Sequence, residues 1–193
     1  MTKKPDYQNL YKIAESQSGF FTSSQAKKAG YSWERLSSLS KQKKFTRIEK
    51  GIYRITLFPA SPFEDLFIAV LKSGSNSVIS HNSALSIYDL SDILPGEIHM
   101  IIPQTRSRRR KGIKYHICRI SKNEITSYKG LPITTVERTI TDGIRSGLDA
   151  NLIKQAINQG IDRGMITRES LSDQARHYGK NVFEIIHSIL NGV

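Results

Sequence analysis

The chain has 193 residues, of which 38% are hydrophobic and 24% are charged, a composition typical of folded globular proteins rather than disordered or collagen-like ones. No run of about 18 apolar residues occurs, and the first residues are polar rather than an apolar signal core, so we expect a cytoplasmic protein without a membrane span. Cys118 is the single cysteine, which excludes intrachain disulfides and multi-cysteine zinc sites.

The net charge of +12 indicates a polyanionic partner, and its distribution sharpens that indication. Residues 1–57 carry 12 basic and 4 acidic side chains, and residues 104–130 carry 9 and 1. The intervening residues 58–103 carry 1 basic and 5 acidic side chains. The C-terminal residues 131–193 carry 7 of each and are neutral overall. Two positive blocks separated by an acidic stretch argue against the alternative that the basic residues only keep the protein soluble.

The first 57 residues predict the element order helix, strand, helix, turn, helix and hairpin. Trp33, Leu36 and Leu39 supply the apolar positions of the third helix. The predicted elements are a helix from Tyr7 to Ala14, a buried strand at Phe20 and Phe21, a helix capped by Ser23 or Ser24 and ended by Gly30, a helix capped by Ser32 and reaching about Lys43, and a β-hairpin from Phe45 to Ile55 around Glu49-Lys50-Gly51.

This order is typical of a winged helix-turn-helix, in which the third helix enters the DNA major groove and the hairpin contacts the flanking backbone. Small hydroxyls and a cation on the polar face of the third helix suit base edges and phosphates. An alternative is a three-helix module whose polar face is solvated or binds a protein. The candidate DNA-binding residues here are Ser23, Gln25, Lys28, Ser32, Arg35, Ser38, Lys41, Gln42, Lys44, Arg47, Lys50 and Arg54.

Pro59 and Pro62 mark the predicted boundary between a DNA-binding domain of residues 1–57 and an α+β domain of residues 58–193. The second domain is expected to open with a helix capped by Ser61 and ended by Gly74. The later elements are a short helix through Ala84, Leu85 and Tyr88, apolar strands at Ile98 to Pro103 and Ile113 to Ile120, a strand at Tyr128 to Ile133, a helix opened by the capping box Thr134-x-x-Glu137, and two or three further helices.

The two apolar strands predict a β-hairpin whose loop is strongly basic. Five cations within six residues repel one another unless an anion is near, and phosphates match arginine bidentately. DNA is the favoured partner because the first domain is also basic, while RNA, an acidic protein surface and solvent stay open. The candidate contacts of this region are Arg106, Arg108, Arg109, Arg110, Lys111 and Lys114.

Catalytic patterns are weak, so we expect no enzyme, no metal and no cofactor. The five histidines lack metalloprotease spacing, and Cys118 lies in an apolar strand, where a buried inert thiol is the better interpretation. Glu97-Ile98-His99 lacks the lysine of a metal-dependent nuclease, and Gly74-Ser75 is not followed by an Asp-x-Asp pair that would hold magnesium.

Three segments, in their order and spacing, resemble the AbiEi family, the antitoxins of type IV abortive-infection toxin-antitoxin systems in bacteria. They are Lys50–Arg54 (KGIYR), Ser80–Leu85 (SHNSAL) and Leu131–Asp142 (LPITTVERTITD). We interpret the last two as structural, with Glu137 completing a helix cap and with Arg138 and Asp142 as a helix-surface ion pair at i, i+4.

The resemblance implies a repressor whose winged helix binds repeats in the promoter of its own operon. It also implies that the second domain counteracts a nucleotidyltransferase-like toxin without needing a stable complex. A protein- or RNA-interaction module whose basic loop engages the toxin or its substrate is the alternative.

Overall fold

The computed structural model describes residues 4–104 and 110–192, and it confirms the α+β class. By its internal contacts the chain forms two compact units. The first consists of Met1–Ser75 and Lys129–Leu131, and the second of Asn76–Tyr128 and Pro132–Val193. Each unit is described by itself.

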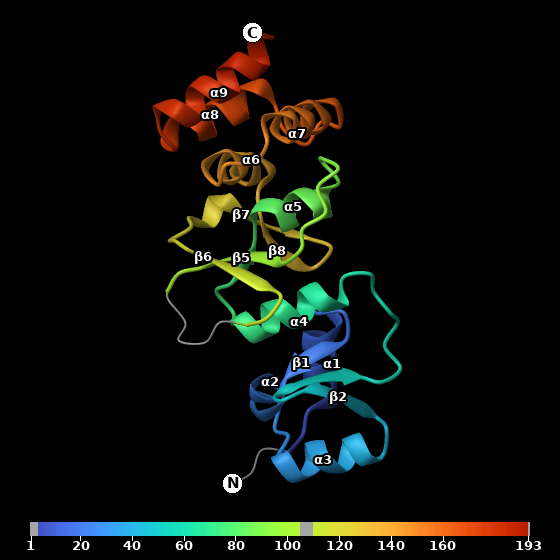
Figure 1. Ribbon diagram of the computed structural model, residues 1–193. Coiled ribbons are helices and arrows are strands. Elements are labelled where there is room, and N and C mark those ends of the chain that lie inside the picture. The colour runs from blue at the N-terminus through green and yellow to red at the C-terminus, as the bar shows by residue number, and fades with distance from the viewer. Residues whose placement is uncertain (1–3, 105–109, 193) are drawn as a thin grey trace. The chain divides into compact units, whose positions relative to one another are not determined.

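The first unit contains the predicted order of elements around a three-stranded sheet (Figure 1). The sheet order is β1-β3-β2, and both pairings are antiparallel. The elements are α1 (Tyr7–Glu15), β1 (Phe20–Thr22), α2 (Ser23–Lys28), α3 (Trp33–Lys41), β2 (Phe45–Glu49), β3 (Ile52–Ile55) and α4 (Glu64–Ser73). Helices α2 and α3 with the β2–β3 hairpin form the winged helix-turn-helix layout.

Side-chain caps fix where the helices of the turn begin. Ser32 caps α3 as predicted, because its hydroxyl accepts a hydrogen bond from the Arg35 backbone N–H at 3.3 Å. The predicted cap of α2 was wrong by one residue. Thr22 is the cap, and its hydroxyl and the Gln25 side chain complete a capping box that Ser23 and Ser24 do not join.

An aromatic core holds α3 and the wing to the rest of the first unit. Phe21 lies between Phe45, whose ring centroid is 5.0 Å away, and Tyr53 at 5.8 Å. Leu36 is the residue of α3 that enters this core, with 1% of its surface exposed. The buried members of the core cluster are Leu10, Ala14, Phe21, Ala26, Ala29, Tyr31, Leu36, Phe45, Tyr53 and Ile55.

Helix α4 belongs to the first unit by its contacts. It begins at Glu64, two residues later than predicted, and Ser61 organises the turn before it: the Ser61 hydroxyl accepts from the Phe63 N–H and the Ser61 N–H donates to the Glu64 carboxylate, at 3.2 Å each. Two ion pairs connect α4 to the wing: Arg54–Glu64 at 2.8 Å and Lys72–Glu49 at 2.9 Å. The division into compact units thus falls after Ser75, and residues 1–57 as a DNA-binding domain stay a prediction.

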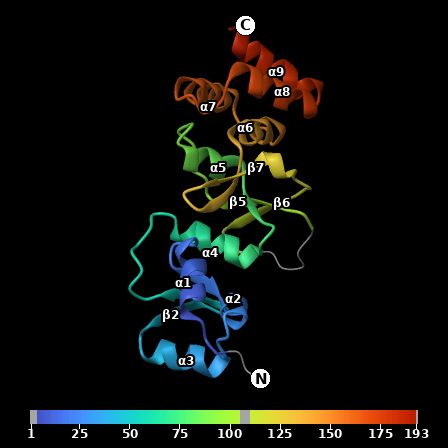
Figure 2. The same ribbon diagram turned by 180° about the vertical axis from the view of Figure 1, so that it is seen from behind.

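The second unit is a five-stranded sheet with helices packed above it. The strand order is β6-β5-β4-β8-β7. In both views α7, α8 and α9 lie on the side of α6 that faces away from the sheet (Figures 1 and 2). The elements are β4 (Val78–Ile79), α5 (His81–Tyr88), β5 (Ile98–Ile102), β6 (Ile113–Ile117), η1 (Lys122–Glu124), β7 (Ile125–Tyr128), β8 (Leu131–Thr134), α6 (Val136–Arg145), α7 (Ala150–Asp162), α8 (Arg168–His177) and α9 (Lys180–Asn191).

The predicted basic hairpin was wrong, because β5 and β6 pair in parallel, from Ile98 opposite Ile113 to Ile102 opposite Ile117. A hairpin requires antiparallel strands, so β5 and β6 do not form one. Apolar residues at strand spacing do not distinguish the two directions. The chain turns into β6 at Gly112, where φ is +77° and the Ile113 N–H donates to the Arg110 carbonyl at 3.1 Å.

Two further local predictions differ from the structure. The single strand expected at Tyr128 to Ile133 is split into the neighbouring strands β7 and β8 by Lys129 and Gly130, both at positive φ as in a two-residue hairpin turn. The cap of α6 is Thr135 and not Thr134, and its partner is the Arg138 N–H at 3.3 Å rather than Glu137. Thr134 is buried, and its hydroxyl pairs with that of Thr139 at 2.7 Å.

A buried ion-pair network centred on Arg138 corrects the predicted helix-surface pair. Arg138 and Asp142 are each only 2% exposed, and the guanidinium donates to Asp142 at 2.9 Å and to Glu124 at 2.9 Å. Tyr178 at the end of α8 hydrogen-bonds both Arg138 and Glu124. Burial alone would raise the pKa of Glu124, but hydrogen bonds from Tyr178, the Ser121 N–H and Arg138 lower it to about 2. The network therefore joins α6 to η1 through the Arg138–Glu124 ion pair, and both to α8 through the hydrogen bonds of the Tyr178 hydroxyl.

Candidate nucleic-acid interface

The exposed surface of α3 is wide and polar. Leu36 is buried and Leu39 half-buried, whereas Glu34, Ser38 and Lys41 are not covered on the opposite side of the helix. The Ser38 hydroxyl accepts from the Gln42 side chain at 3.2 Å, which aligns two predicted contact residues on one helical turn. This surface confirms the amphipathic pattern and offers the donors and acceptors that base edges require.

The wing is the β2–β3 hairpin, closed by Lys50 and Gly51. Gly51 has φ of +85°, the left-handed conformation that such tight turns require. Arg47 and Lys50 are exposed, and the pairing register shifts between Arg47 and Glu49, so that Ile48 forms a bulge. The wing therefore presents two exposed cations.

Two predicted contact residues are instead engaged inside the first unit. Gln25 accepts from the Thr22 N–H at 2.7 Å and donates to Gln17 at 2.8 Å. Arg54 donates to the Phe58 and Pro59 carbonyls at 3.0 Å each and pairs with Glu64. Neighbouring residues of a strand point to opposite faces, so Arg54 lies on the face opposite to Tyr53, and the chain leading into α4 covers that face. We therefore leave Gln25 and Arg54 out of the interface.

The other predicted contact residues of the first unit differ in exposure. Ser23 is half-buried at the start of α2, and Ser32 is used as a cap although it is exposed. Lys28, Arg35, Gln42 and Lys44 are exposed. The accessible residues that α3 and the wing bring together are Arg35, Ser38, Lys41, Gln42, Lys44, Arg47 and Lys50.

A groove of about 670 Å³ runs along one flank of α3. Its rim carries Arg35, Gln42 and Lys44, which the sequence predicted as DNA contacts, together with Lys43. A helix reaching Lys43 would place the stem of this residue on the apolar face, but Lys43 follows the end of the helix in a left-handed conformation with φ of +57° and is exposed. A helical wheel does not apply beyond the end of the helix. The floor is apolar and includes Tyr31, Leu39 and Phe45.

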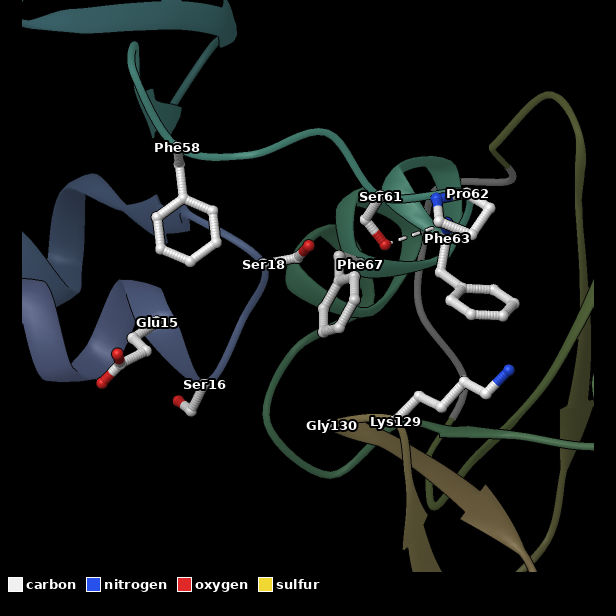
Figure 3. Close-up of a pocket in the computed structure, with 10 residues that line it drawn as sticks. All are labelled: Glu15, Ser16, Ser18, Phe58, Ser61, Pro62, Phe63, Phe67, Lys129 and Gly130. Atoms are coloured by element: carbon white, nitrogen blue, oxygen red, sulfur yellow. Dashed lines mark hydrogen bonds between the residues drawn. The ribbon is translucent and has the colours of Figure 1, made fainter.

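A second recess, of about 580 Å³, lies in the first unit away from α3 (Figure 3). Phe58, Phe63 and Phe67 form much of its wall, and the Lys129 ammonium lies 5.0 Å from the centre of the Phe63 ring. Gly19 permits the approach of Phe58, because a Cβ atom there would lie 2.5 Å from the phenyl ring. This recess follows from aromatic packing and does not contain any of the predicted contact residues.

In the second unit, the described part of the basic region contains Arg110, Lys111 and Lys114. Lys111 and Lys114 are exposed and Arg110 is half-buried. Lys114 lies on β6, opposite His99 of β5. Arg106, Arg108 and Arg109, which the sequence also predicted as contacts, lie outside the described residues.

Three histidines gather over the β4–β5–β6 part of the second sheet. His81 stacks on His116 with ring centroids 3.5 Å apart, and His116 hydrogen-bonds His99 at 3.3 Å. Burial, reinforced by the neighbouring imidazoles, lowers the pKa of His81 to about 3 and that of His116 to about 4. These imidazoles are neutral at pH 7 and satisfied by one another and by Ser80.

Among the described residues, no group of three or more His, Cys, Asp or Glu side chains is arranged to bind a metal ion. Cys118 is half-buried, and its sulfur lies 3.7 Å from the Arg138 guanidinium. The described helices are all too short or too polar to cross a membrane. Within the described residues, α3 with the wing presents exposed polar and cationic side chains in an arrangement that suits nucleic acid.

Comparisons with known proteins agree with this arrangement. Residues 8–56 match the family of transcriptional regulators described as AbiEi antitoxins, which confirms the resemblance inferred from the sequence and covers the winged helix-turn-helix. No curated protein matches the chain. The crystal structure of the RV2827C protein from Mycobacterium tuberculosis has a similar fold, with a TM-score of 0.52 and 13% identity over 98% of this chain and 78% of that one.

Proposed function

We propose that this chain, whose residues 8–56 are those of an AbiEi-type regulator, is an antitoxin and a sequence-specific DNA-binding repressor of its own toxin-antitoxin operon. In this proposal α3 binds in the major groove of double-stranded DNA, and the wing contacts the adjacent backbone. The second unit counteracts a nucleotidyltransferase-like toxin. A stable complex with that toxin is not required.

The observation that carries the proposal is the exposed face of α3. Arg35 and Lys41 lie on it, and neither forms an ion pair with a described residue. Arg47 and Lys50 extend the positive surface onto the wing. Exposed cations next to small hydroxyls match the two tasks of such a helix, which are backbone positioning and base contact.

The proposal is tested by the binding of the full chain to duplex DNA from immediately upstream of its own gene. Replacing Arg35, Ser38 and Lys41 together by Ala should weaken binding to that duplex by about 100-fold or more, since each base contact is worth about 1–3 kcal/mol. The matched control is Lys12→Ala, which removes an exposed cation of the same unit from α1. Electrophoretic mobility shift and fluorescence anisotropy measure both.

Binding of the wild-type chain to the upstream duplex no tighter than to random duplex would contradict sequence-specific repression. Equal losses for the triple variant and for Lys12→Ala would remove α3 from the interface. The protein- or RNA-interaction alternative predicts the reverse pattern, namely retention of the toxin or of single-stranded RNA with no retardation of the upstream duplex.

The antitoxin activity is tested separately by co-expression with the neighbouring toxin gene in bacteria. The α3 triple variant should still restore growth, because we assign neutralisation to the second unit, while a reporter driven by the operon promoter should be derepressed. Growth arrest with the folded triple variant would contradict the division of labour between the two units.

A further inference from the structure

Trp33 is the first residue of α3, and 60% of its surface is exposed. The apolar spacing of the sequence groups it with Leu36 and Leu39, but only the two leucines contact the core cluster, Leu36 as a member and Leu39 as a partly buried neighbour. The exposed indole offers a large apolar surface and one N–H donor to a partner molecule. Its position at the start of the proposed recognition helix calls for a functional explanation.

The neighbours of Trp33 leave it accessible on the surface of α3. Ser37 is one helical turn further along, at i+4, and is exposed and small, so it does not cover the indole. The other large apolar side chains that are exposed in the first unit are Tyr7, Tyr11, Ile48 and Leu57, and these lie on α1, on the wing or after β3. Among the described residues, Trp33 is thus the exposed large apolar side chain of α3.

The charge around Trp33 favours a base over a phosphate as its partner. Glu34 is the next residue and is fully exposed, and a hydrogen bond with Ser32 lowers the pKa of its carboxyl, which keeps it ionised. A carboxylate at this end of the helix repels the phosphate backbone but can accept a hydrogen bond from cytosine N4. In the major groove, the apolar feature of a base edge is the 5-methyl group of thymine.

We infer that Trp33 is a specificity-determining residue that packs its indole against a thymine 5-methyl group in the major groove. This inference rests on the proposed function and adds to it a preference for thymine at one position of the binding site. Residues at the N-terminal end of a recognition helix are those that approach base edges in helix-turn-helix complexes. The polar side chains Ser38 and Lys41 then contact the following bases or phosphates.

The test begins with duplexes selected by the wild-type chain from a random library. In a selected duplex each thymine is replaced in turn by uracil, which removes only the 5-methyl group. One replacement should weaken wild-type binding about fourfold, the equivalent of about 0.8 kcal/mol for one methyl group. The same replacement should not change DNA binding by the Trp33→Ala variant, because this variant already lacks the contact with the methyl group. The two changes form a double-mutant cycle that isolates this contact.

Trp33→Ala should itself weaken binding to the selected duplex about tenfold or more, and Trp33→Phe should retain part of the sensitivity to uracil. The matched control is Tyr11→Ala, which removes an exposed aromatic side chain, 37% exposed, from α1 and away from the groove beside α3. It should leave the affinity and the uracil sensitivity unchanged. Trp33 is the single tryptophan of the chain, so quenching of its fluorescence by the duplex reports the contact directly.

The outcomes separate this inference from the proposed function. A wild-type chain that selects no sequence overturns the proposed function. A wild-type chain that selects a sequence, but whose binding is insensitive to every uracil replacement or is equally sensitive with Trp33→Ala, overturns the role of Trp33 and leaves repression intact. Circular dichroism shows whether the Trp33→Ala variant is folded. If this variant is unfolded, Trp33→Phe replaces it in the comparison of thymine and uracil duplexes, because it changes the side chain less.

Discussion

Arg35 on α3 and Arg138 on α6 carry the same guanidinium group in opposite environments. Arg35 is exposed and forms no ion pair with a described residue, whereas Arg138 is 2% exposed and bonded to Asp142, Glu124 and Tyr178. The first unit keeps this cation available, and the second uses its own to join three helical elements. Positive charge in the sequence therefore indicates a nucleic-acid surface only where the structure leaves it exposed.

The largest effect is expected from breaking the buried network. Arg138→Met should lower the free energy of unfolding by about 3–5 kcal/mol, because Asp142 and Glu124 would remain buried without their cation. Arg176→Met is the matched control, since its pair with Asp173 is more than half exposed, and it should cost less than about 1 kcal/mol. Urea denaturation, with hydrogen exchange of the α6 amides, measures both. Equal small losses would contradict the structural role of the network.

Acidification should weaken the second unit next. In the unfolded chain histidines protonate near pH 6.5, but burial holds the pKa of His81 at about 3 and that of His116 at about 4. Between about pH 6.5 and these lower pKa values the unfolded state binds more protons than the folded state. The free energy of unfolding therefore falls as the pH is lowered, by on the order of a few kcal/mol in total. Denaturation at pH 7.5, 6 and 5 tests this.

His116→Phe provides the control for that titration, because it retains an aromatic ring to stack on His81 and removes one titrating group. Its stability should depend less steeply on pH between 7.5 and 5 than that of the wild type. A wild-type stability that is constant over this range would show that these imidazoles are not held neutral.

The smallest effect is expected at the one exposed carboxylate of α3. Glu34→Gln should increase binding to random duplex DNA by about two- to fivefold, because it removes a charge that repels phosphates. Discrimination between selected and random duplexes should decrease. Fluorescence anisotropy at fixed salt measures both affinities, and unchanged binding to random DNA would place Glu34 outside the interface.

Local signals predicted the first unit well. Ser32 as a cap, Leu36 as a core residue and the Lys50-Gly51 turn each depend on neighbours within a few positions. The exposure of Trp33 was missed because an apolar residue on a short helix is normally assigned to the core. The internal partners of Arg54, Glu64 and the Phe58 and Pro59 carbonyls, were not predicted because they follow the predicted domain boundary.

Long-range pairing limited the predictions for the second unit. The apolar runs of β5 and β6 fit either strand direction, and the register of the pair shows them to be parallel. An i, i+4 pair such as Arg138 and Asp142 is compatible with a surface or a core. Its burial depends on Glu124 and Tyr178, which are 14 and 40 residues away along the chain, and no local pattern predicts such contacts.

The most direct test of the central claim is the salt dependence of DNA binding. If the exposed cations of α3 and the wing contact phosphates, replacing Lys41, Lys44 and Arg47 by Ala should reduce the slope of log K against log salt by about 0.9 for each phosphate that is no longer neutralised. The Lys12→Ala control should leave the slope unchanged. An unchanged slope for the triple variant, with DNA binding retained, would contradict the assignment of α3 and the wing as the DNA interface.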